Sequence, residues 1–98
     1  MNQDNKRYYV YIIASKRNGT LYTSVTNDIK RRVYEHKRDI NAGFTKRYQI
    51  HMLAYIEEYS NPQEAIAREK QIKAGSRKAK LRLIESMNPK WVDLGEGL

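Results

Sequence analysis

The chain has 98 residues, which is enough for one compact domain and too few for two. It contains no cysteine, and this excludes a disulfide framework, a thiolate metal site and a cysteine nucleophile. Nineteen Lys and Arg residues stand against eleven Asp and Glu residues, for a formal net charge of +8. We therefore expect a single basic domain over residues 1–98, with its core at about residues 8–94.

The positive charge is clustered, with seven of the nineteen cations in residues 28–49 and seven in residues 68–82. This clustering favours a nucleic acid as the partner over a basic surface that only aids solubility. The longest apolar run, "YYVYIIA", is too short to span a membrane, and "MNQDNKR" lacks the apolar centre of a secretory signal. We expect a cytoplasmic protein that does not bind membranes, with a monomer as the default.

Two strands are predicted over residues 8–14 and 20–26, because both stretches are rich in Tyr, Val, Ile and Thr. The dipeptide Asn18-Gly19 between them suits a tight hairpin turn. With that turn, five residues share one face of the sheet: Tyr9, Tyr11, Ile13, Tyr22 and Ser24. The same turn would leave Tyr11 and Tyr22 far apart along the strands, so their hydroxyls could meet only across a longer loop or a bulge.

The first helix is predicted from a cap at Asn27 or Asp28 to about Ile40. A loop, "NAGFTKRY", and a third strand, "HMLAYIEEY", follow it.

Asn61-Pro62 with Glu64 starts a second helix, which stops at Gly75. Ser76 begins a third helix that Asn88-Pro89 ends. The tail packs Trp91 on the body and then frays. The order of elements predicts an α+β fold with a three-stranded antiparallel sheet flanked by three helices.

The first helix turns charged side chains toward its own buried side. Ile29, Val33 and Ile40 form its apolar stripe; His36 falls inside this stripe, and Arg32 sits on its edge. The remaining cations of this segment point outward.

The second helix repeats this feature with an acid. Its apolar arc is bounded by Ile66 on one side and by Ala65 and Ile72 on the other, with Glu69 near the middle and Arg68 pointing away. An ionised carboxylate inside an apolar face must be paired, metal-bound or protonated. Two interpretations stay open: Arg32 and Glu69 form a structural ion pair with His36 as a core imidazole, or these three groups form a functional site.

These residues resemble the motifs of the GIY-YIG nucleases, the family that includes the incision domain of the repair protein UvrC. "YVY" at residues 9–11 stands where the family has GIY, and "YTS" at 22–24 where it has YIG. Arg32 follows ten residues after the second tyrosine, His36 comes one helical turn later, and "EAIAREKQIK" places the family's glutamate at Glu69. The resemblance covers nearly the whole chain, and it is strongest with the small single-domain members.

The resemblance implies a divalent-metal-dependent endonuclease that hydrolyses phosphodiester bonds, with DNA favoured over RNA. Glu69 would hold one Mg²⁺ or Mn²⁺ ion, Tyr11 would orient or deprotonate the attacking water, and Arg32 would bind the phosphate. Tyr22 and His36 would complete the catalytic cluster. Six flanking cations are expected to track the nucleic-acid backbone: Lys30, Arg31, Lys37, Lys46, Arg47 and Lys73.

The sequence departs from the family pattern at two positions. Tyr9 stands in place of the first glycine of GIY, and Ser24 in place of the glycine of YIG. A glycine beside a site permits close backbone approach, whereas a serine adds a β-carbon and a hydroxyl. Ser24 therefore motivates a second hypothesis, a nucleic-acid-binding module on the same fold with weak or absent catalysis. A third is a basic protein-interaction domain in which Arg32 and Glu69 form only a structural pair.

Overall fold

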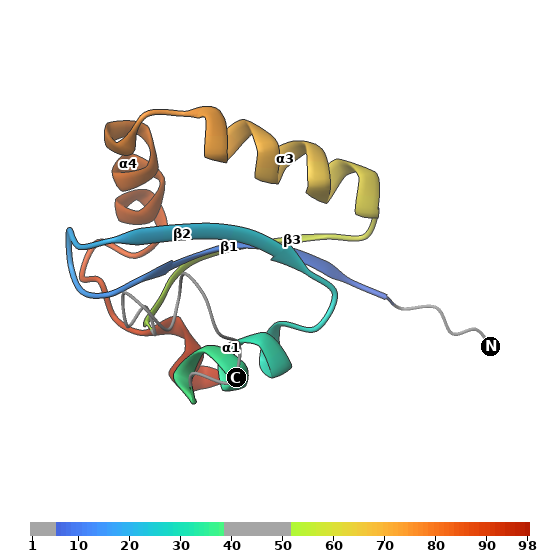
Figure 1. Ribbon diagram of the computed structural model, residues 1–98, viewed down its shortest axis with the longest axis horizontal. Helices are drawn as coiled ribbons and strands as arrows, with labels where there is room; N and C mark the ends of the chain where they lie inside the picture. Colours follow the sequence, from blue (N-terminus) through green and yellow to red (C-terminus); the bar gives the residue numbers. More distant parts are fainter. Residues whose placement is uncertain (1–5, 39–51) are drawn as a thin grey trace.

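The computed structural model of the protein describes residues 6–38 and 52–98. One antiparallel sheet has the strand order β2-β1-β3. Its strands are β1 (Tyr8–Ala14), β2 (Leu21–Thr26) and β3 (Met52–Tyr59). Helix α1 (Ile29–Lys37) covers one face, while α3 (Pro62–Ala74) and α4 (Arg77–Met87) cover the other, as Figure 1 shows. The predicted α+β fold, a three-stranded antiparallel sheet with three helices, is confirmed.

The three helices begin at the predicted capping residues. The Asp28 side chain accepts a hydrogen bond from the Arg31 backbone N–H, and the Asn61 side chain accepts two from the start of α3. Ser76 caps α4 in the same way. These side chains satisfy backbone donors that have no partner within the first helical turn. Helix α1 ends at Lys37, and the predicted end at Ile40 lies outside the described residues.

The hairpin between β1 and β2 differs from the predicted tight turn. The Ser15 N–H donates to the Thr20 carbonyl at 3.0 Å, and the Gly19 N–H donates to the Lys16 carbonyl at 2.9 Å. The loop therefore spans residues 15–20, with Asn18 at a φ of 58°. A two-residue turn at Asn18-Gly19 is wrong, because the strands separate before they reach that dipeptide.

The longer loop shifts the strand register by two residues and keeps the predicted faces. Tyr11 pairs with Ser24, and Ile13 pairs with Tyr22. Tyr11 and Tyr22 are therefore diagonal neighbours on one face, within reach of each other's side chains. The register places the two motif tyrosines side by side. The sequence predicts this arrangement only if the hairpin loop is longer than the tight turn.

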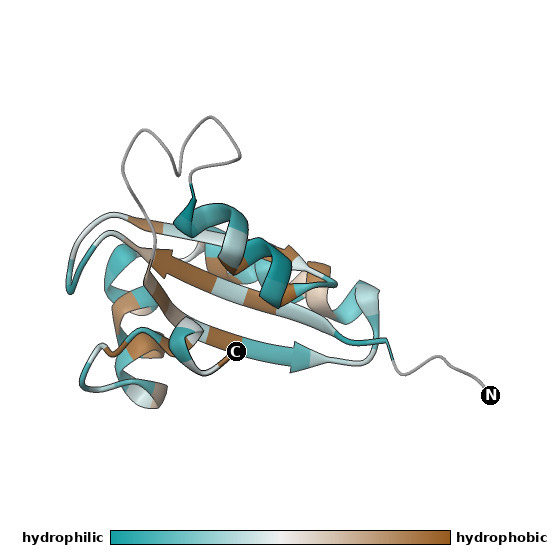
Figure 2. Ribbon diagram, turned by 90° about the horizontal axis from the view of Figure 1, so that it is seen from below, coloured by the Kyte–Doolittle hydropathy of each residue, from teal (hydrophilic) through white to brown (hydrophobic). Residues whose placement is uncertain are grey.

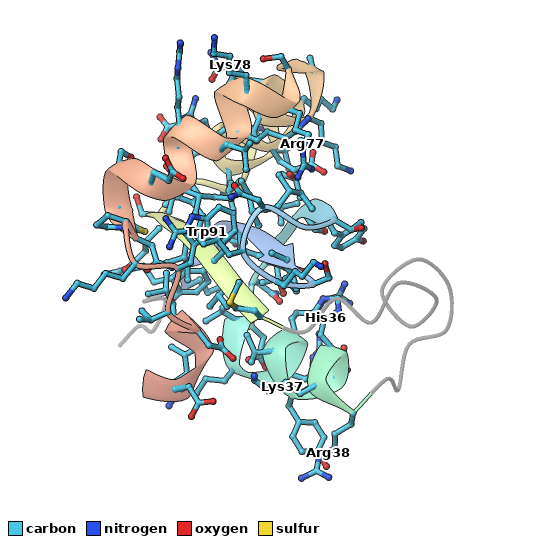
Figure 3. The ribbon with its side chains drawn as sticks, turned by 90° about the vertical axis from the view of Figure 1, so that its left-hand side faces the viewer. His36, Lys37, Arg38, Arg77, Lys78 and Trp91 are labelled. Carbon is cyan, nitrogen blue, oxygen red and sulfur yellow. The ribbon has the colours of Figure 1, made fainter. Side chains whose placement is uncertain are left out.

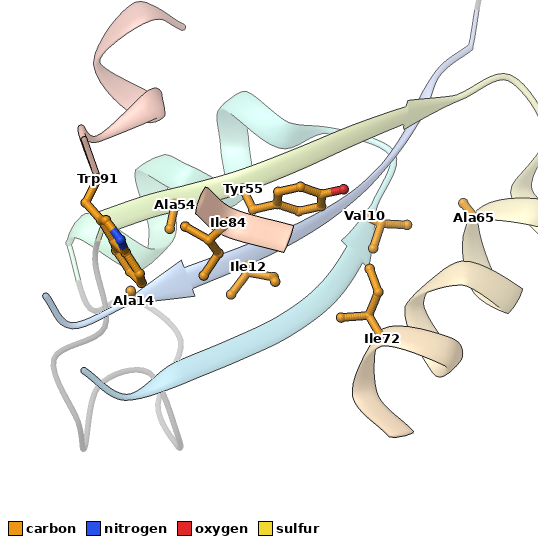
Figure 4. Close-up of a cluster of buried hydrophobic side chains, with 9 residues drawn as sticks. All are labelled: Val10, Ile12, Ala14, Ala54, Tyr55, Ala65, Ile72, Ile84 and Trp91. Carbon is orange, nitrogen blue, oxygen red and sulfur yellow. The ribbon is translucent and has the colours of Figure 1, made fainter. Parts of the chain in front are cut away.

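Hydrophobic side chains fill both sides of the central strand β1. On the side of α3 and α4, nine buried residues form the cluster drawn in Figure 4: Val10, Ile12, Ala14, Ala54, Tyr55, Ala65, Ile72, Ile84 and Trp91. On the side of α1, the buried residues are Tyr11, Ile13, Ile29, Val33 and Leu53. The outward face of α1 is hydrophilic (Figure 2). Burial of each large apolar side chain stabilises the fold by about 1.5–3 kcal/mol.

The C-terminal tail is held in place, so the prediction that it frays is wrong. The Asp93 carboxylate accepts hydrogen bonds from the backbone N–H groups of Leu53, at 3.0 Å, and Gly95, at 2.9 Å. It also pairs with the Lys37 ammonium. Burial alone would raise the pKa of Asp93, but these contacts outweigh it and lower the pKa. A short 3-10 helix, η1 (Leu94–Gly97), follows.

A polar cluster around Glu57 joins β3 to α3. The Glu57 carboxylate accepts hydrogen bonds from the Tyr55 hydroxyl, from the Tyr59 hydroxyl at 2.7 Å, and from Arg68 Nε and Nη2, each at 3.0 Å. Burial alone would raise the pKa of Glu57, and the hydrogen bonds from these three partners lower it instead. Arg68 was predicted to point away from the sheet, and that prediction is wrong because Glu57 attracts its guanidinium.

The same cluster predicts a loss of stability in alkali. Burial and the hydrogen bond to Glu57 raise the pKa of Tyr55 to about 12, above about 10 for an unfolded tyrosine. The unfolded state therefore loses this proton at lower pH, and the stabilisation by neutral Tyr55 is lost between about pH 10 and pH 12. Urea unfolding should show Tyr55→Phe destabilised by about 1–2 kcal/mol at pH 8 and by much less at pH 12. An equal difference at both pH values would contradict this assignment.

Candidate active site

The hydroxyl of Tyr11 lies at the centre of a polar cluster beneath α1. Tyr11 is fully buried in β1. Its hydroxyl accepts a long hydrogen bond, 3.4 Å, from Arg32 Nε and lies 3.4 Å from His36 Nε2. Arg32 and His36 are one turn apart on α1, so the helix presents both to the same tyrosine. His36 points toward the sheet and Arg38 points away from it (Figure 3).

Tyr22 joins this cluster from the edge strand β2. Its ring packs edge-on against His36 with 5.9 Å between centroids, and the Tyr11 ring does the same at 6.1 Å. The imidazole therefore lies against both motif tyrosines. This contact depends on the register that the six-residue hairpin loop sets.

Arg32 is held in a partly buried position at the rim of the cluster. The hydrogen bond to Tyr11 raises the pKa of Arg32 more than burial lowers it, and Glu35 and Tyr22 raise it further. Arg32 Nη1 lies 3.6 Å from Glu35 Oε1. A guanidinium held in this way is charged at every physiological pH and has donors left for an anion.

Glu69 is buried on α3, with 9% of its surface exposed. Its carboxylate pairs with Lys73 one turn along the helix, with 2.6 Å between Nζ and Oε2. The alternative of an Arg32–Glu69 ion pair is not what the structure shows, because Arg32 pairs with Glu35 and Glu69 with Lys73. The acid and the guanidinium therefore do not neutralise each other.

Helices α1 and α3 lie on opposite faces of the sheet, and each carries a cation whose pKa the two motif tyrosines raise. The hydrogen bond to Glu69 raises the pKa of Lys73 more than burial lowers it. Tyr22 and Tyr11 raise this pKa further. The same two phenols raise the pKa of Arg32. Tyr11 and Tyr22 thus lie within electrostatic range of the cations on both helices.

A groove at the end of the sheet where β1 starts and β2 ends joins α1 to α3 directly. It has a volume of about 410 Å³ and opens to solvent. Its lining comes from β1, from the segment that joins β2 to α1, and from α3. The lining residues are Tyr8, Val25, Thr26, Asn27, Arg31, Arg32, Pro62 and Ile66. Arg32 therefore belongs both to the polar cluster and to the groove.

The structure brings together only some of the cations predicted to bind nucleic acid. Arg31 lines the groove beside Arg32, Lys73 binds Glu69, and Lys30 is exposed on the outer side of α1. Lys37 is bound to Asp93 and is thereby directed to the C-terminal segment. Lys46 and Arg47 lie outside the described residues.

Sequence reasoning missed two features of this region. Ile66 was expected to bound a buried arc, but 44% of its surface is exposed because it faces the groove. The Lys73–Glu69 pair was also missed. The spacing of four residues between an acid and a following lysine on a helix could have predicted that pair.

Glu69 offers one hard oxygen donor for a divalent cation, and Lys73 Nζ lies 2.6 Å from that carboxylate. Among residues 6–38 and 52–98, no three His, Cys, Asp or Glu side chains converge as a metal site. A cation here would therefore use the Glu69 carboxylate and water molecules, an arrangement that Mg²⁺ tolerates because it dehydrates reluctantly. A closed tetrahedral zinc site does not fit these residues.

A three-stranded sheet with two tyrosines on its paired strands, an arginine and a histidine on α1 and a glutamate on α3 defines the class of the protein. The GIY-YIG catalytic domain family matches residues 7–82, a range that contains all five of these side chains. The chain belongs to the GIY-YIG family, whose catalytic domains are of the nuclease type.

Within this family, the chain is similar to the UPF0213 proteins. A UPF0213 protein of Staphylococcus saprophyticus is 38% identical over 78 residues, which are 80% of this chain and 94% of that protein. One of Staphylococcus aureus is 42% identical over 79 residues, with the same two coverages. The solution NMR structure of a UPF0213 protein from Bacillus halodurans matches with a TM-score of 0.53 and 28% identity, and the match covers 86% of this chain and 87% of that one.

Proposed function

We propose that the protein is a divalent-metal-dependent endonuclease that hydrolyses phosphodiester bonds in nucleic acid, with DNA favoured over RNA. The observation that carries the proposal is the Tyr11 hydroxyl, which contacts both Arg32 and His36 while Tyr22 packs on the same imidazole. Within the described residues no helix is long and apolar enough to cross a membrane. A cytoplasmic location and a monomeric state are part of the proposal.

Each residue of the cluster has a chemical role in phosphodiester hydrolysis. Arg32 binds the phosphate and stabilises the negative charge that develops on it. Tyr11 orients or deprotonates the attacking water through its hydroxyl, which contacts Arg32 and His36. His36 and Tyr22 hold this hydroxyl in place. Glu69 would hold a Mg²⁺ or Mn²⁺ ion, which supplies charge neutralisation on the phosphoryl oxygens.

Conservative replacement of the arginine tests the proposal. Arg32→Lys keeps the charge but loses the planar fork and the Nε donor to Tyr11, so we expect nicking of supercoiled plasmid in Mg²⁺ or Mn²⁺ to slow by about 10²-fold. The matched control is Arg82→Lys on α4, an exposed arginine that does not line the groove, where we expect a change of less than about 3-fold. Wild-type nicking by Arg32→Lys, or nicking that a chelator does not stop, would refute the proposal.

Ser24 supports a second candidate function, a nucleic-acid-binding module without catalysis. Ser24 pairs directly with Tyr11 in the sheet, where the family motif has a glycine. Its extra β-carbon and hydroxyl therefore lie next to the central tyrosine. This function predicts salt-dependent binding without cleavage, and cleavage that appears in Ser24→Gly would identify the serine as the cause.

A further inference from the structure

We infer that the groove between α1 and α3 is a subsite for one unpaired nucleotide of the DNA, next to the phosphate that Arg32 binds. The inference rests on the proposed function and names its substrate class: DNA with a flap, bulge or single-stranded end at the cut. The end of β2, the start of α1 and the start of α3, which supply most of the lining, lie at the same end of the sheet (Figure 1).

The lining of the groove divides into an apolar wall and a cationic rim. Tyr8, Val25, Pro62 and Ile66 supply the wall, and Arg31 and Arg32 supply the rim. A nucleotide has the matching division, because its base has two apolar faces and its phosphate is an anion. The volume of about 410 Å³ lies within the range of about 300–1,000 Å³ for small-ligand sites.

The apolar wall distinguishes an unpaired base from a paired one. In a duplex, the faces of a base are covered by its stacked neighbours, so Ile66 and Tyr8 would find only sugar and phosphate. An unpaired base exposes a face that can pack on these side chains. Ile66 is exposed on the helix that carries Glu69 one turn further on. A base packed there keeps the adjoining phosphate near Arg32, which lines the same groove.

The two arginines of the rim can bind phosphates of the strand, and Asn27 can contact the edge of the base. Arg31 and Arg32 follow each other on α1, so they can contact successive phosphates of a strand. Asn27 is exposed at the end of β2, and its amide offers both a donor and an acceptor. One amide contact discriminates weakly, so the subsite is expected to accept all four bases.

The test uses the full-length chain carrying Glu69→Gln, so that bound DNA is not cut, and two fluorescently labelled 30-base-pair duplexes. One duplex is fully paired and the other has a single bulged 2-aminopurine. We expect at least about 5-fold tighter binding of the bulged duplex, measured by anisotropy, with a change in 2-aminopurine emission. Adding Ile66→Ala should remove most of this preference and leave the affinity for paired DNA unchanged. Adding Ile66→Met, which restores an apolar wall, should recover the preference.

The matched control is Val92→Ala, at an apolar residue that is 54% exposed and does not line the groove. It should keep the full preference. Equal affinity for both duplexes, or a preference that survives Ile66→Ala, would overturn the inference. The proposed function fails separately: bulged DNA that binds through Ile66 but is never cut by the wild-type chain refutes the nuclease and keeps the subsite. Equal cleavage of paired and bulged DNA refutes the subsite and keeps the nuclease.

Discussion

Replacing Glu69 by glutamine is expected to slow metal-dependent cleavage by about 10³-fold or more. Glutamine keeps the size of the side chain, but its neutral amide is a weaker ligand than a carboxylate for a hard divalent cation. Nicking of supercoiled plasmid in Mg²⁺ and in Mn²⁺ measures the loss. Binding to the same DNA without metal should be unchanged or tighter, because the substitution removes one negative charge from a basic protein.

The matched control is Glu64→Gln on the first turn of the same helix, where the side chain is exposed. It should keep the wild-type rate within about 3-fold. The variant Glu69→Gln should also keep its fold, because the contact with exposed Lys73 is worth less than about 1 kcal/mol. Wild-type cleavage by Glu69→Gln would show that this carboxylate does not hold the metal.

Replacing Asn88 by alanine is expected to lower the free energy of unfolding by about 2–4 kcal/mol. The pairing of β3 with β1 shifts between Leu53 and Tyr55, so Ala54 has no partner in β1. Asn88 is 3% exposed. Its amide donates to the Ala54 carbonyl at 3.1 Å and to the Val92 carbonyl at 2.8 Å, and its oxygen accepts from the Val92 N–H at 3.0 Å.

Alanine at residue 88 would leave the Ala54 carbonyl buried without a donor, and it would release the segment that places Trp91 on the core. Urea unfolding followed by Trp91 fluorescence measures the cost, and the melting temperature should fall by about 10–20 °C. Ser86→Ala, two residues earlier and exposed, should change the stability by less than about 0.5 kcal/mol. An unchanged urea midpoint for Asn88→Ala would contradict the role assigned to this amide.

The starts of the three helices and the break between α3 and α4 were predictable because their determinants are close together in the chain. Asn61 caps α3 through N–H groups two and three residues away, and Gly75 and Ser76 separate α3 from α4 over the same short range. Helical periodicity likewise predicted that His36 and Glu69 face inward, and both are buried. Local hydrogen bonds and side-chain periodicity depend on a few successive residues, so they can be predicted from a short stretch of the sequence.

Other features of the site depend on contacts between distant residues. The Asn18-Gly19 dipeptide predicts a tight turn, yet the packing of the sheet selects a longer loop and thereby the Tyr11–Ser24 register. Arg68 turned toward Glu57, eleven residues earlier, because β3 offers a carboxylate next to α3. Neither outcome can be derived from the residues that flank the turn or the arginine.

The sequence by itself determined that His36 and Glu69 turn inward, and it determined the order of the helices and strands. Only the tertiary structure decided that α1 and α3 cover opposite faces of the sheet and approach each other at the end of β2. Tyr22 thereby lies within electrostatic range of Lys73, and a groove opens between Arg32 and Ile66 at the end of β2. The reason is physical: periodicity specifies a buried side for each helix, whereas the choice of sheet face and edge follows from packing the whole chain into one core.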